Sequence, residues 1–280
     1  MSRVVPLFTL IRIHNLMIAM LVIIESAYLL SDAISFKIFF LIIAILSFMA
    51  FGYIINDVLD QKIDSTNNKK RPLTTNLITK KNAIKLSYCF VLLGIGSSFF
   101  LNTYTQSIIL FLLLPLLSLY NYYFKRYFLL GNLIVSFLLG MVFIITEIEI
   151  LQTYHTLLPI AYLAFHLNLI REIIKDIADY VGDLQAKMTT IPIILGEKLS
   201  IVLLRILIIL FLLFSPIYVC SLITHSTTLI FLFILLIEFP LLYSLFLLRR
   251  LPSKKTIYNL SKLYKIIFLN GLIIIPMMKG

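Results

Sequence analysis

The chain has 280 residues, of which 61% are hydrophobic and only 13% are charged, and its mean hydropathy is +1.03. Because a soluble core needs far less apolar surface, this composition excludes soluble enzymes and predicts a polytopic membrane protein. The formal net charge is +11, which is typical of basic loops that lie against anionic lipid. Nucleic acid is not needed to explain the charge.

Nine apolar stretches recur along the chain, each near the roughly 20 residues that a helix needs to cross about 30 Å of hydrocarbon. They are residues 13–30, 36–55, 84–101, 106–124, 128–148, 156–174, 201–222, 228–247 and 258–277. The sequence therefore predicts an all-α polytopic membrane protein with nine transmembrane helices.

The basic residues are distributed unevenly between the two sides that these spans define. Of the 24 Lys and Arg residues, all except Lys37 and Lys279 lie before the first span or beside the connections that follow the even-numbered spans. Lys262 and Lys265 are assigned here to the connection after the eighth span. Cations beside a span are retained in the cytoplasm. We therefore expect a multi-pass protein of the cytoplasmic (inner) membrane whose N-terminus is cytoplasmic.

The second span runs directly into NDVLDQKID, residues 56–64. If its helix continues, Asp57, Asp60 and Asp64 lie on one face, because residues three and four apart are neighbours on a helix. Carboxylates stacked at the mouth of an apolar helix repel one another and are costly to desolvate. The spacing therefore indicates that a cation stabilises them.

KDIADYVGD, residues 175–183, repeats this spacing with Asp176, Asp179 and Asp183. Four spans separate the two motifs, so the chain returns to the same side of the membrane and the two acidic faces can meet there. We therefore expect the candidate active site on the cytoplasmic side. This arrangement has the form of a parallel repeat of helix bundles.

The repeat defines the expected domain organisation. We expect one domain, residues 1–280, with halves of approximately 1–127 and 128–248 and a final helix at 257–278.

Six facing carboxylates are unstable without a counter-ion. Hard divalent cations prefer oxygen ligands, and Mg2+ usually keeps waters and shares itself with substrate phosphates. A zinc site would need His or Cys ligands, which neither motif contains. The sequence therefore predicts Mg2+ at six aspartates, which are the candidate catalytic and metal-binding residues: Asp57, Asp60, Asp64, Asp176, Asp179 and Asp183.

Basic side chains return close to the first motif. The connection of residues 61–82 carries Lys69, Lys70 and Arg71, and a metal together with cations binds phosphate. The alternative is a basic loop that lies on lipid head groups. Arg12, before the first span, is typical of a membrane-edge anchor, with a polar cavity open to the cytoplasm as the alternative.

Two more groups of polar residues are candidates for substrate binding. After the fourth span, Tyr120, Asn121 and Lys125 provide donors for a phosphate or aromatic faces for a cation, whereas an aromatic belt is the alternative for the tyrosines. Near the end of the sixth span, charged and amide side chains share a helical face, with Glu172 adjacent, and by default such costly charges mark a site. These residues are Asn168, Arg171 and Lys175.

A divalent-metal site over an apolar, aromatic-lined bundle suits a substrate with a diphosphate head and a long hydrocarbon tail, such as an isoprenyl diphosphate. Mg2+ would neutralise the departing diphosphate, and Arg and Lys would complete the anion clamp. Aromatic faces would stabilise the allylic cation, which a lipid-soluble or amphipathic acceptor captures in a dry groove. A cation-coupled transporter is the alternative of another class, although transporters usually place their sites near the midplane on broken helices.

Over essentially its whole length, the chain resembles the UbiA superfamily of intramembrane prenyltransferases. NDVLDQKID matches the family's N-D-x-x-D-x-x-x-D, and KDIADYVGD matches its second D-x-x-D-x-x-x-D. The resemblance implies two bundled halves around a central cavity, a cytoplasmic cap formed by the connections after the second and sixth spans, and Mg2+ that bridges the aspartates to a prenyl diphosphate. It also implies substrate positioning by Asn56 and diphosphate contacts for Arg71 and Lys125.

REIIKDIADYVGD followed by TTIPIILG is most similar to the digeranylgeranylglyceryl phosphate synthase branch, whose members join a geranylgeranyl group to a glycerol-phosphate ether lipid. Three residues depart from its pattern: Ala178 stands where an acidic residue is common, Lys187 where glycine is usual and Lys69 where proline is frequent. Despite these departures, the similarity to this branch makes geranylgeranylglyceryl phosphate the expected acceptor. Prenyltransferases for 4-hydroxybenzoate, dihydroxynaphthoate, haem or chlorophyll-type acceptors share the metal machinery, so these acceptors stay as alternatives.

Overall fold

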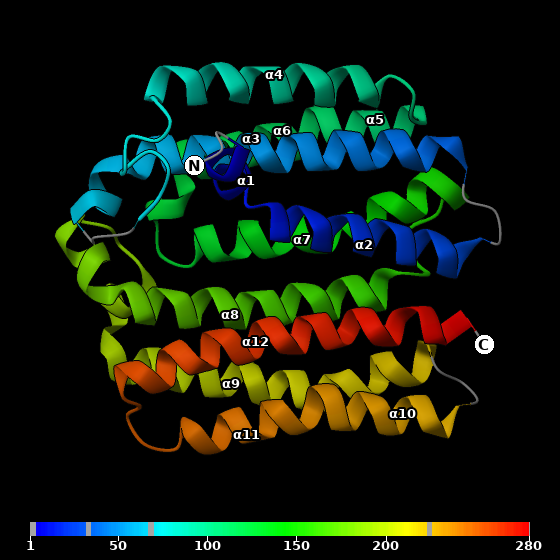
Figure 1. Cartoon of the computed structure of the whole chain (residues 1–280). Helices are drawn as coiled ribbons and strands as arrows, with labels where there is room; N and C mark the ends of the chain where they lie inside the picture. The colour runs from blue at the N-terminus through cyan, green and yellow to red at the C-terminus, as the bar shows by residue number, and fades with distance from the viewer. Residues whose placement is uncertain (1–3, 32–34, 67–69, 223–225, 280) are drawn as a thin grey trace.

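The structure is a computed structural model that describes residues 4–31, 35–66, 70–222 and 226–279. Within those ranges, all regular structure is helical (Figure 1), which confirms the all-α prediction. In chain order, with π and 3-10 segments written η, the elements are α1 (Val4–Leu10), α2 (Ile13–Leu30), α3 (Phe36–Thr66), α4 (Lys80–Ser98), α5 (Thr103–Ile108), η1 (Ile109–Leu113), α6 (Leu114–Tyr122), η2 (Phe124–Arg126), α7 (Leu130–Leu151), α8 (Leu158–Gln185), α9 (Ile191–Leu222), α10 (Thr227–Phe233), η3 (Ile234–Glu238), α11 (Phe239–Leu247), α12 (Lys254–Ile274) and η4 (Ile275–Lys279).

Among the described residues, seven helical segments are long and apolar enough to cross a membrane. They are Ile13–Leu30, Phe36–Ser65, Thr103–Tyr122, Leu130–Leu151, Ile191–Val219, Thr227–Leu247 and Lys254–Lys279. The other two predicted spans correspond to α4 and α8, which each carry several charged residues at one end. Both helices nevertheless run alongside the apolar ones (Figure 1).

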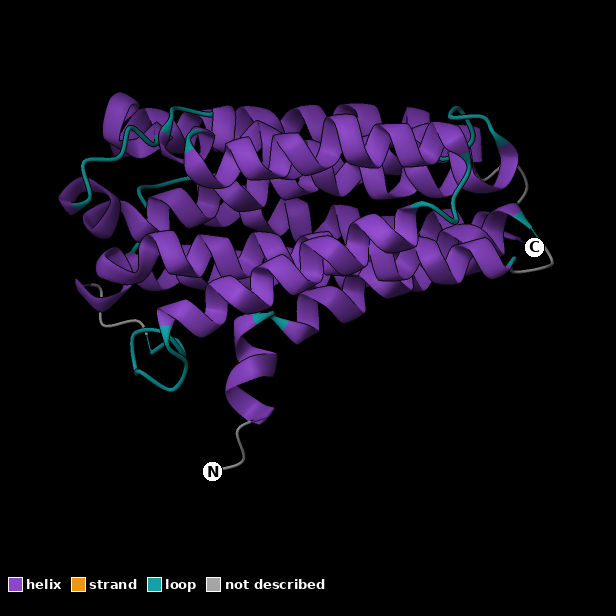
Figure 2. Cartoon of the chain, turned by 90° about the horizontal axis from the view of Figure 1, so that it is seen from above, coloured by secondary structure: helices purple, strands orange, loops and turns teal. Residues whose placement is uncertain are grey.

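The long helices lie side by side in a layered bundle (Figures 1 and 2). Helix α4 packs on α3, and α8 packs against α7, α9 and α12. Helices α3 and α8 both finish at the same end of the bundle, on the left in Figure 1. We call this the aspartate end, because each of these helices carries an acidic motif in its last turns.

Both motif helices extend through their acidic residues, as the spacing required. Helix α3 ends at Thr66 and α8 at Gln185. The prediction that the connection begins at residue 61 is therefore wrong, because residues 61–66 continue α3. The preceding turns of α3 pack through Ile54 and Val58 in a small apolar cluster with the segment that returns from the motif.

The amphipathic pattern of α8 explains which way its polar residues point. Ile170, Ile173, Ile174 and Ile177 recur at helical spacing and are buried in the apolar cluster that α8 forms with α9, α11 and α12. The face that carries Arg171 is thereby turned away from that cluster and toward the interior cavity described below.

Two helices of the bundle widen in the same manner. The π segments η1 and η3 each precede a proline by two residues, Pro115 and Pro240. Proline lacks an N–H and clashes with the carbonyl four residues before it, which locally disturbs the helical ladder. At the second site, Asn270 Nδ2 donates to the Leu236 carbonyl at 2.9 Å.

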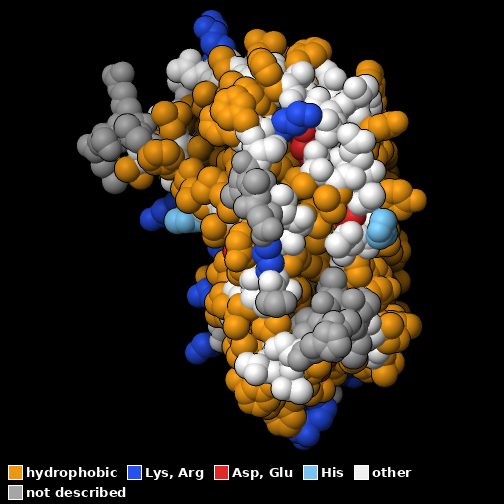
Figure 3. All heavy atoms as spheres, turned by 90° about the vertical axis from the view of Figure 1, so that its right-hand side faces the viewer, with side chains coloured by type: hydrophobic (Ala, Val, Ile, Leu, Met, Phe, Trp, Pro, Cys, Tyr) orange, Lys and Arg blue, Asp and Glu red, His pale blue; other side chains and the backbone are white. Residues whose placement is uncertain are grey.

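At the opposite end of the bundle, a buried glutamate of α7 holds the connection to α8. Glu147 is fully buried, and its carboxylate accepts hydrogen bonds from Thr153 Oγ1 at 2.8 Å and from the N–H groups of Thr156 at 2.9 Å and Leu157 at 2.7 Å. N–H groups at a helix start lack partners within the helix. Figure 3 looks onto this end and shows only small spots of acidic side chain.

We expect Glu147→Ala to lower the free energy of unfolding by roughly 1–3 kcal/mol for each buried N–H group left without an acceptor. The midpoint of thermal unfolding in detergent micelles measures this effect. The matched control is Glu197→Ala, because the Glu197 side chain is exposed on α9. Equal midpoints for the two variants would contradict a stabilising role for Glu147.

Candidate functional site

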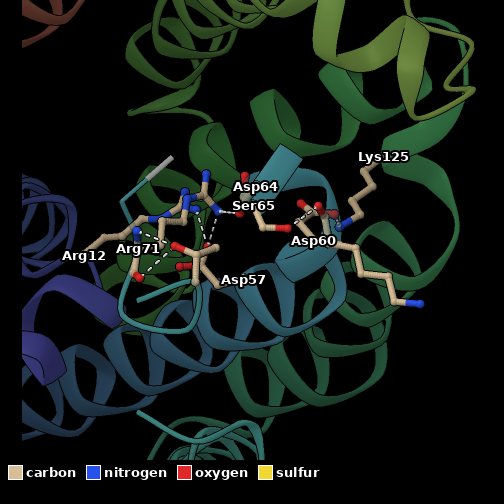
Figure 4. Close-up of polar contacts among 9 residues, drawn as sticks. Arg12, Asp57, Asp60, Asp64, Ser65, Arg71 and Lys125 are labelled. Atoms are coloured by element: carbon tan, nitrogen blue, oxygen red, sulfur yellow. Dashed lines mark hydrogen bonds and ion pairs between the residues drawn. The ribbon is translucent and has the colours of Figure 1, made fainter. Parts of the chain in front are cut away.

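Arginines from two other segments neutralise the buried carboxylates of the first motif (Figure 4). Asp57 and Asp64 are each 3% exposed. Arg71 Nη1 lies 2.6 Å from Asp57 Oδ1 and 2.7 Å from Asp64 Oδ2. Arg12 Nη2 lies 2.9 Å from the same Asp57 oxygen, and its guanidinium stacks 4.8 Å from the centre of the Tyr53 ring. One cationic nitrogen therefore holds two carboxylates that would otherwise repel each other.

The third carboxylate of this motif has its own cation. Lys125 Nζ, in η2, lies 2.6 Å from Asp60 Oδ1. Burial lowers the pKa of Lys125, and the charge of Asp60 opposes this shift. A Cβ at Gly131 would lie 3.0 Å from the Lys125 Cα. Glycine thus allows α7 to begin close to η2 and keeps Lys125 against the motif.

The second motif is less enclosed than the first. Asp176 accepts a hydrogen bond from Asn132 Nδ2, in α7, at 2.9 Å. Asp176 lies beyond the predicted span 156–174, and burial raises its pKa to about 7. Asp183 is partly buried, whereas Asp179 is exposed.

The backbone of the turn after α8 explains why glycine is usual at position 187 in the branch that the sequence resembles. Lys187 has a φ of 53°, in the left-handed region. Its N–H donates to the Leu184 carbonyl, and the N–H of Met188 donates to the Asp183 carbonyl at 3.0 Å. This is the conformation in which glycine commonly ends a helix. A lysine there costs about 1–2 kcal/mol, because its Cβ crowds the following carbonyl.

Two hydrogen bonds join the segment that follows the second motif to η2. The hydroxyl and the N–H of Thr189 both donate to the Arg126 carbonyl, at 2.7 and 3.0 Å. Arg126 directly follows Lys125, which contacts Asp60. The segment after the second motif is therefore fastened to the cation that neutralises the first motif.

A cavity of about 380 Å3 lies among α2, α3, α6, α7, α8 and α12. Asn56, which adjoins Asp57, and Lys175, which adjoins Asp176, both line it. At the aspartate end its walls carry charged, amide and phenolic side chains. Farther along α3 and α12 the walls become apolar, through residues such as Phe48 and Phe268. The cavity is thus polar at one end and apolar over the rest of its length.

The structure brings most of the predicted substrate-binding residues to this cavity. Those that line it are Asn56, Tyr120, Asn121, Asn168, Arg171 and Lys175. Arg71 and Lys125 instead contact the carboxylates of α3. Asn121 is buried, and its Nδ2 donates to the Leu117 carbonyl at 3.0 Å, so part of its donor capacity is used within its own helix. Lys69 lies outside the described residues.

Of the two alternatives for Arg12, the structure favours the polar cavity over the membrane-edge anchor, because Arg12 contacts Asp57 and lines the cavity. Asn132 and Lys265 escaped the sequence prediction. No charged residue flanks Asn132 in the sequence, so nothing marked it as part of the site. Lys262 and Lys265 were assigned to a connection, but both lie inside α12, and Lys265 lines the cavity.

The chemical type of the donors in the first motif, rather than their geometry, suits a hard divalent cation. Within the described part of the chain, no group of three or more His, Cys, Asp or Glu side chains is placed to hold a metal. The motif offers only carboxylate oxygens, stacked so closely that the single nitrogen Arg71 Nη1 contacts two of them. Oxygen donors of this kind suit Mg2+, whereas zinc sites in proteins usually include His or Cys ligands.

Comparison with known proteins places nearly the whole chain in one protein family. The model of the UbiA prenyltransferase family matches residues 16–269. The chain is 33% identical over 267 residues to digeranylgeranylglyceryl phosphate synthase of Methanobrevibacter smithii, with 93% of each chain covered. It is 31% identical over 276 residues to that of Methanocaldococcus jannaschii, with 95% of this chain and 93% of the relative covered.

Solved structures show the same similarity in three dimensions. A digeranylgeranylglyceryl phosphate synthase structure superposes with a TM-score of 0.78 at 27% identity and covers 100% of this chain and 99% of its own. A UbiA homologue from Archaeoglobus fulgidus bound to DMAPP and Mg2+ gives a TM-score of 0.68 at 16% identity, with 96% and 98% covered. The second likeness concerns the fold alone.

We expect Arg71→Gln to destabilise the aspartate end, because it leaves Asp57 and Asp64 without their shared cation. Breaking a buried ion pair costs about 3–5 kcal/mol, and the cost here falls at or below that range because the Arg71 side chain is 26% exposed. Thermal unfolding in detergent with a metal chelator measures it. Arg126→Gln is the control, since the Arg126 side chain is exposed. A midpoint as high in Arg71→Gln as in the control would show that the shared ion pair contributes nothing.

Proposed function

Because the chain belongs to the UbiA prenyltransferase family and is an integral membrane prenyltransferase, we propose that it transfers a geranylgeranyl group from its diphosphate to geranylgeranylglyceryl phosphate, with Mg2+. The observation that carries this proposal is that residues beside both motifs line one cavity, at the end of the bundle where α3 and α8 both finish. The gradient of that cavity from polar to apolar suits a diphosphate with a long tail. The relatives named digeranylgeranylglyceryl phosphate synthase support this donor and this acceptor.

The aspartates of the two motifs are the proposed metal ligands. They are Asp57, Asp60, Asp64, Asp176, Asp179 and Asp183. When bound, Mg2+ neutralises the diphosphate as it departs. The close stacking of Asp57 and Asp64 around one cation supports this assignment. With a divalent ion neutralising the motif, Arg71 and Lys125 become free to contact the diphosphate.

The residues of the polar end then have distinct roles in the transfer. Asn56 positions the donor head group. The carbon–oxygen bond of the donor breaks, its electrons leave with the diphosphate, and Arg71 and Lys125 stabilise the departing charge. Tyr53 and Tyr120, which line the cavity, present aromatic faces to the allylic cation. The acceptor hydroxyl oxygen forms the new carbon–oxygen bond, its proton passes to the departing diphosphate, and the apolar walls keep water away.

Acceptors other than a glycerol phosphate have less support. The metal machinery alone would also serve 4-hydroxybenzoate, dihydroxynaphthoate, or a haem or chlorophyll-type acceptor. The two relatives compared above both favour the ether lipid. A cation-coupled transporter is not favoured, since the family model is that of prenyltransferases and both motifs lie at helix ends.

We also propose that nine helices span the membrane, because α4 and α8 run beside the seven apolar segments. The matching π segments η1 and η3 support a repeat with halves 1–127 and 128–248 and a final helix 257–278, within one domain. The unequal placement of Lys and Arg supports a cytoplasmic position for the aspartate end, in the inner membrane. The segments after α3 and α8 would then form a cytoplasmic cap over the cavity.

Asp57→Asn and Asp176→Asn are each expected to reduce Mg2+-dependent prenyl transfer by on the order of 100-fold or more while expression stays intact, because a neutral amide cannot balance a divalent ion at this charged site. Labelled geranylgeranyl diphosphate incubated with membranes measures the transfer. Glu197→Gln, which removes an exposed carboxylate outside both motifs, is the control. Full activity in either asparagine variant would count against the site.

With membranes, Mg2+ and labelled geranylgeranyl diphosphate, we expect labelled product when geranylgeranylglyceryl phosphate is supplied and none when 4-hydroxybenzoate is supplied. Chelation of Mg2+ should abolish the product, since the metal neutralises the leaving group. Product with the aromatic acid alone would overturn the proposed acceptor and leave the prenyltransferase assignment standing.

A further inference from the structure

The polar end of the cavity carries more positive charge than its carboxylate neutralises. Arg171 Nη1 and Lys175 Nζ both contact Glu172, at 2.9 and 2.6 Å. Lys265, from α12, lines the same cavity, and no hydrogen bond or ion pair joins it to the residues that the structure describes. Besides Arg12, which contacts Asp57, three cations therefore line this cavity, and Glu172 is the one carboxylate among the described residues that line it. This excess suits a phosphate monoester, which carries a charge of about −1.5 to −2 at pH 7.

These cations differ from those that neutralise the first motif. Arg71 contacts Asp57 and Asp64, and Lys125 contacts Asp60. Two anionic lipids that react with each other must bring their head groups into one cavity, although like charges repel. A separate group of cations for each head group removes this conflict.

On both α8 and α12, the side chains that line the cavity become apolar one helical turn away from its cations. Leu167 lies one turn from Arg171 on α8, and Phe268 lies one turn from Lys265 on α12; all four residues line the cavity. Leu167 and Phe268 also line a second, apolar cavity of about 60 Å3 between α8, α9 and α12. A lipid whose phosphate lies at the cations can therefore pack its hydrocarbon chain along this wall.

A buried neighbour fixes the orientation of this part of α12. Tyr264 is 2% exposed, and its hydroxyl lies 3.1 Å from Ser244 Oγ, in α11. Because Tyr264 directly precedes Lys265, this contact limits rotation of the helix about its axis. Lys265 is therefore presented to the cavity by a rigid element.

We propose that Lys265, with Arg171 and Lys175, forms a second anion site that holds the phosphate of the acceptor lipid. This inference rests on the proposed function and adds two statements to it. Different cations hold the donor and acceptor head groups, and α12, which carries no aspartate motif, contributes to the choice of acceptor.

The test compares Lys265→Met with Lys262→Met in purified enzyme with Mg2+ and geranylgeranyl diphosphate. Lys262 lies one turn away on α12, its Nζ is over the Tyr258 ring, and it does not line the cavity. We expect Lys265→Met to raise KM for geranylgeranylglyceryl phosphate on the order of tenfold, the effect of losing one charge-assisted hydrogen bond. The donor KM and kcat should change less than about twofold, and Lys265→Arg should retain most of the affinity.

Two further measurements separate a phosphate contact from a general disturbance. With geranylgeranylglycerol, which lacks the phosphate, wild type and Lys265→Met should react alike. The rise in thermal midpoint on adding geranylgeranylglyceryl phosphate should be smaller in Lys265→Met than in Lys262→Met, and this readout requires no turnover.

An equal rise in both variants, or a larger change in donor KM than in acceptor KM, would overturn the inference. Failure of wild type to prenylate the phosphate lipid would instead overturn the proposed function, while the binding measurement still decides the role of Lys265.

Discussion

The carboxylates of α3 depend on cations that reach them from three other parts of the chain. Asp57 and Asp64 are buried beside an apolar bundle, where uncompensated charges are costly. Arg12 comes from the segment before α2, Arg71 from the connection after α3, and Lys125 from η2. Neutralisation of the motif thus fastens these segments together at the aspartate end, and the same contacts shape the polar end of the cavity.

The two motifs are neutralised differently although their spacing is the same. The first is enclosed by guanidinium and ammonium groups, whereas in the second Asp176 contacts the neutral amide of Asn132 and Asp179 is exposed. Ion pairs with Arg12, Arg71 and Lys125 stabilise the first motif. In the proposed reaction, a divalent ion and a diphosphate would add opposite charges between the two motifs.

The sequence predicted the parts of this site that depend on local periodicity. Asp57, Asp60 and Asp64 share a face because α3 continues through them, and the same holds for α8. The polar face of α8 was also visible, since Asn168, Arg171 and Lys175 recur at helical spacing. The aspartate type and the lack of His or Cys in both motifs were enough to predict oxygen ligands for a hard metal. The contact of Arg12 with Asp57 and the position of Lys265 in the cavity wall could not be read in this way, because both depend on helices far away in the chain.

The sequence by itself therefore determined the helical class, the length of most spans and the two acidic faces, because hydrophobic length and residue spacing are local properties. Tertiary structure alone decided which cation meets which carboxylate. It placed Arg71 between Asp57 and Asp64, brought Lys125 to Asp60 through the close approach of Gly131, and turned Lys265 into the cavity. Such pairings follow from how helices pack and rotate against one another, and no spacing along a single helix encodes them.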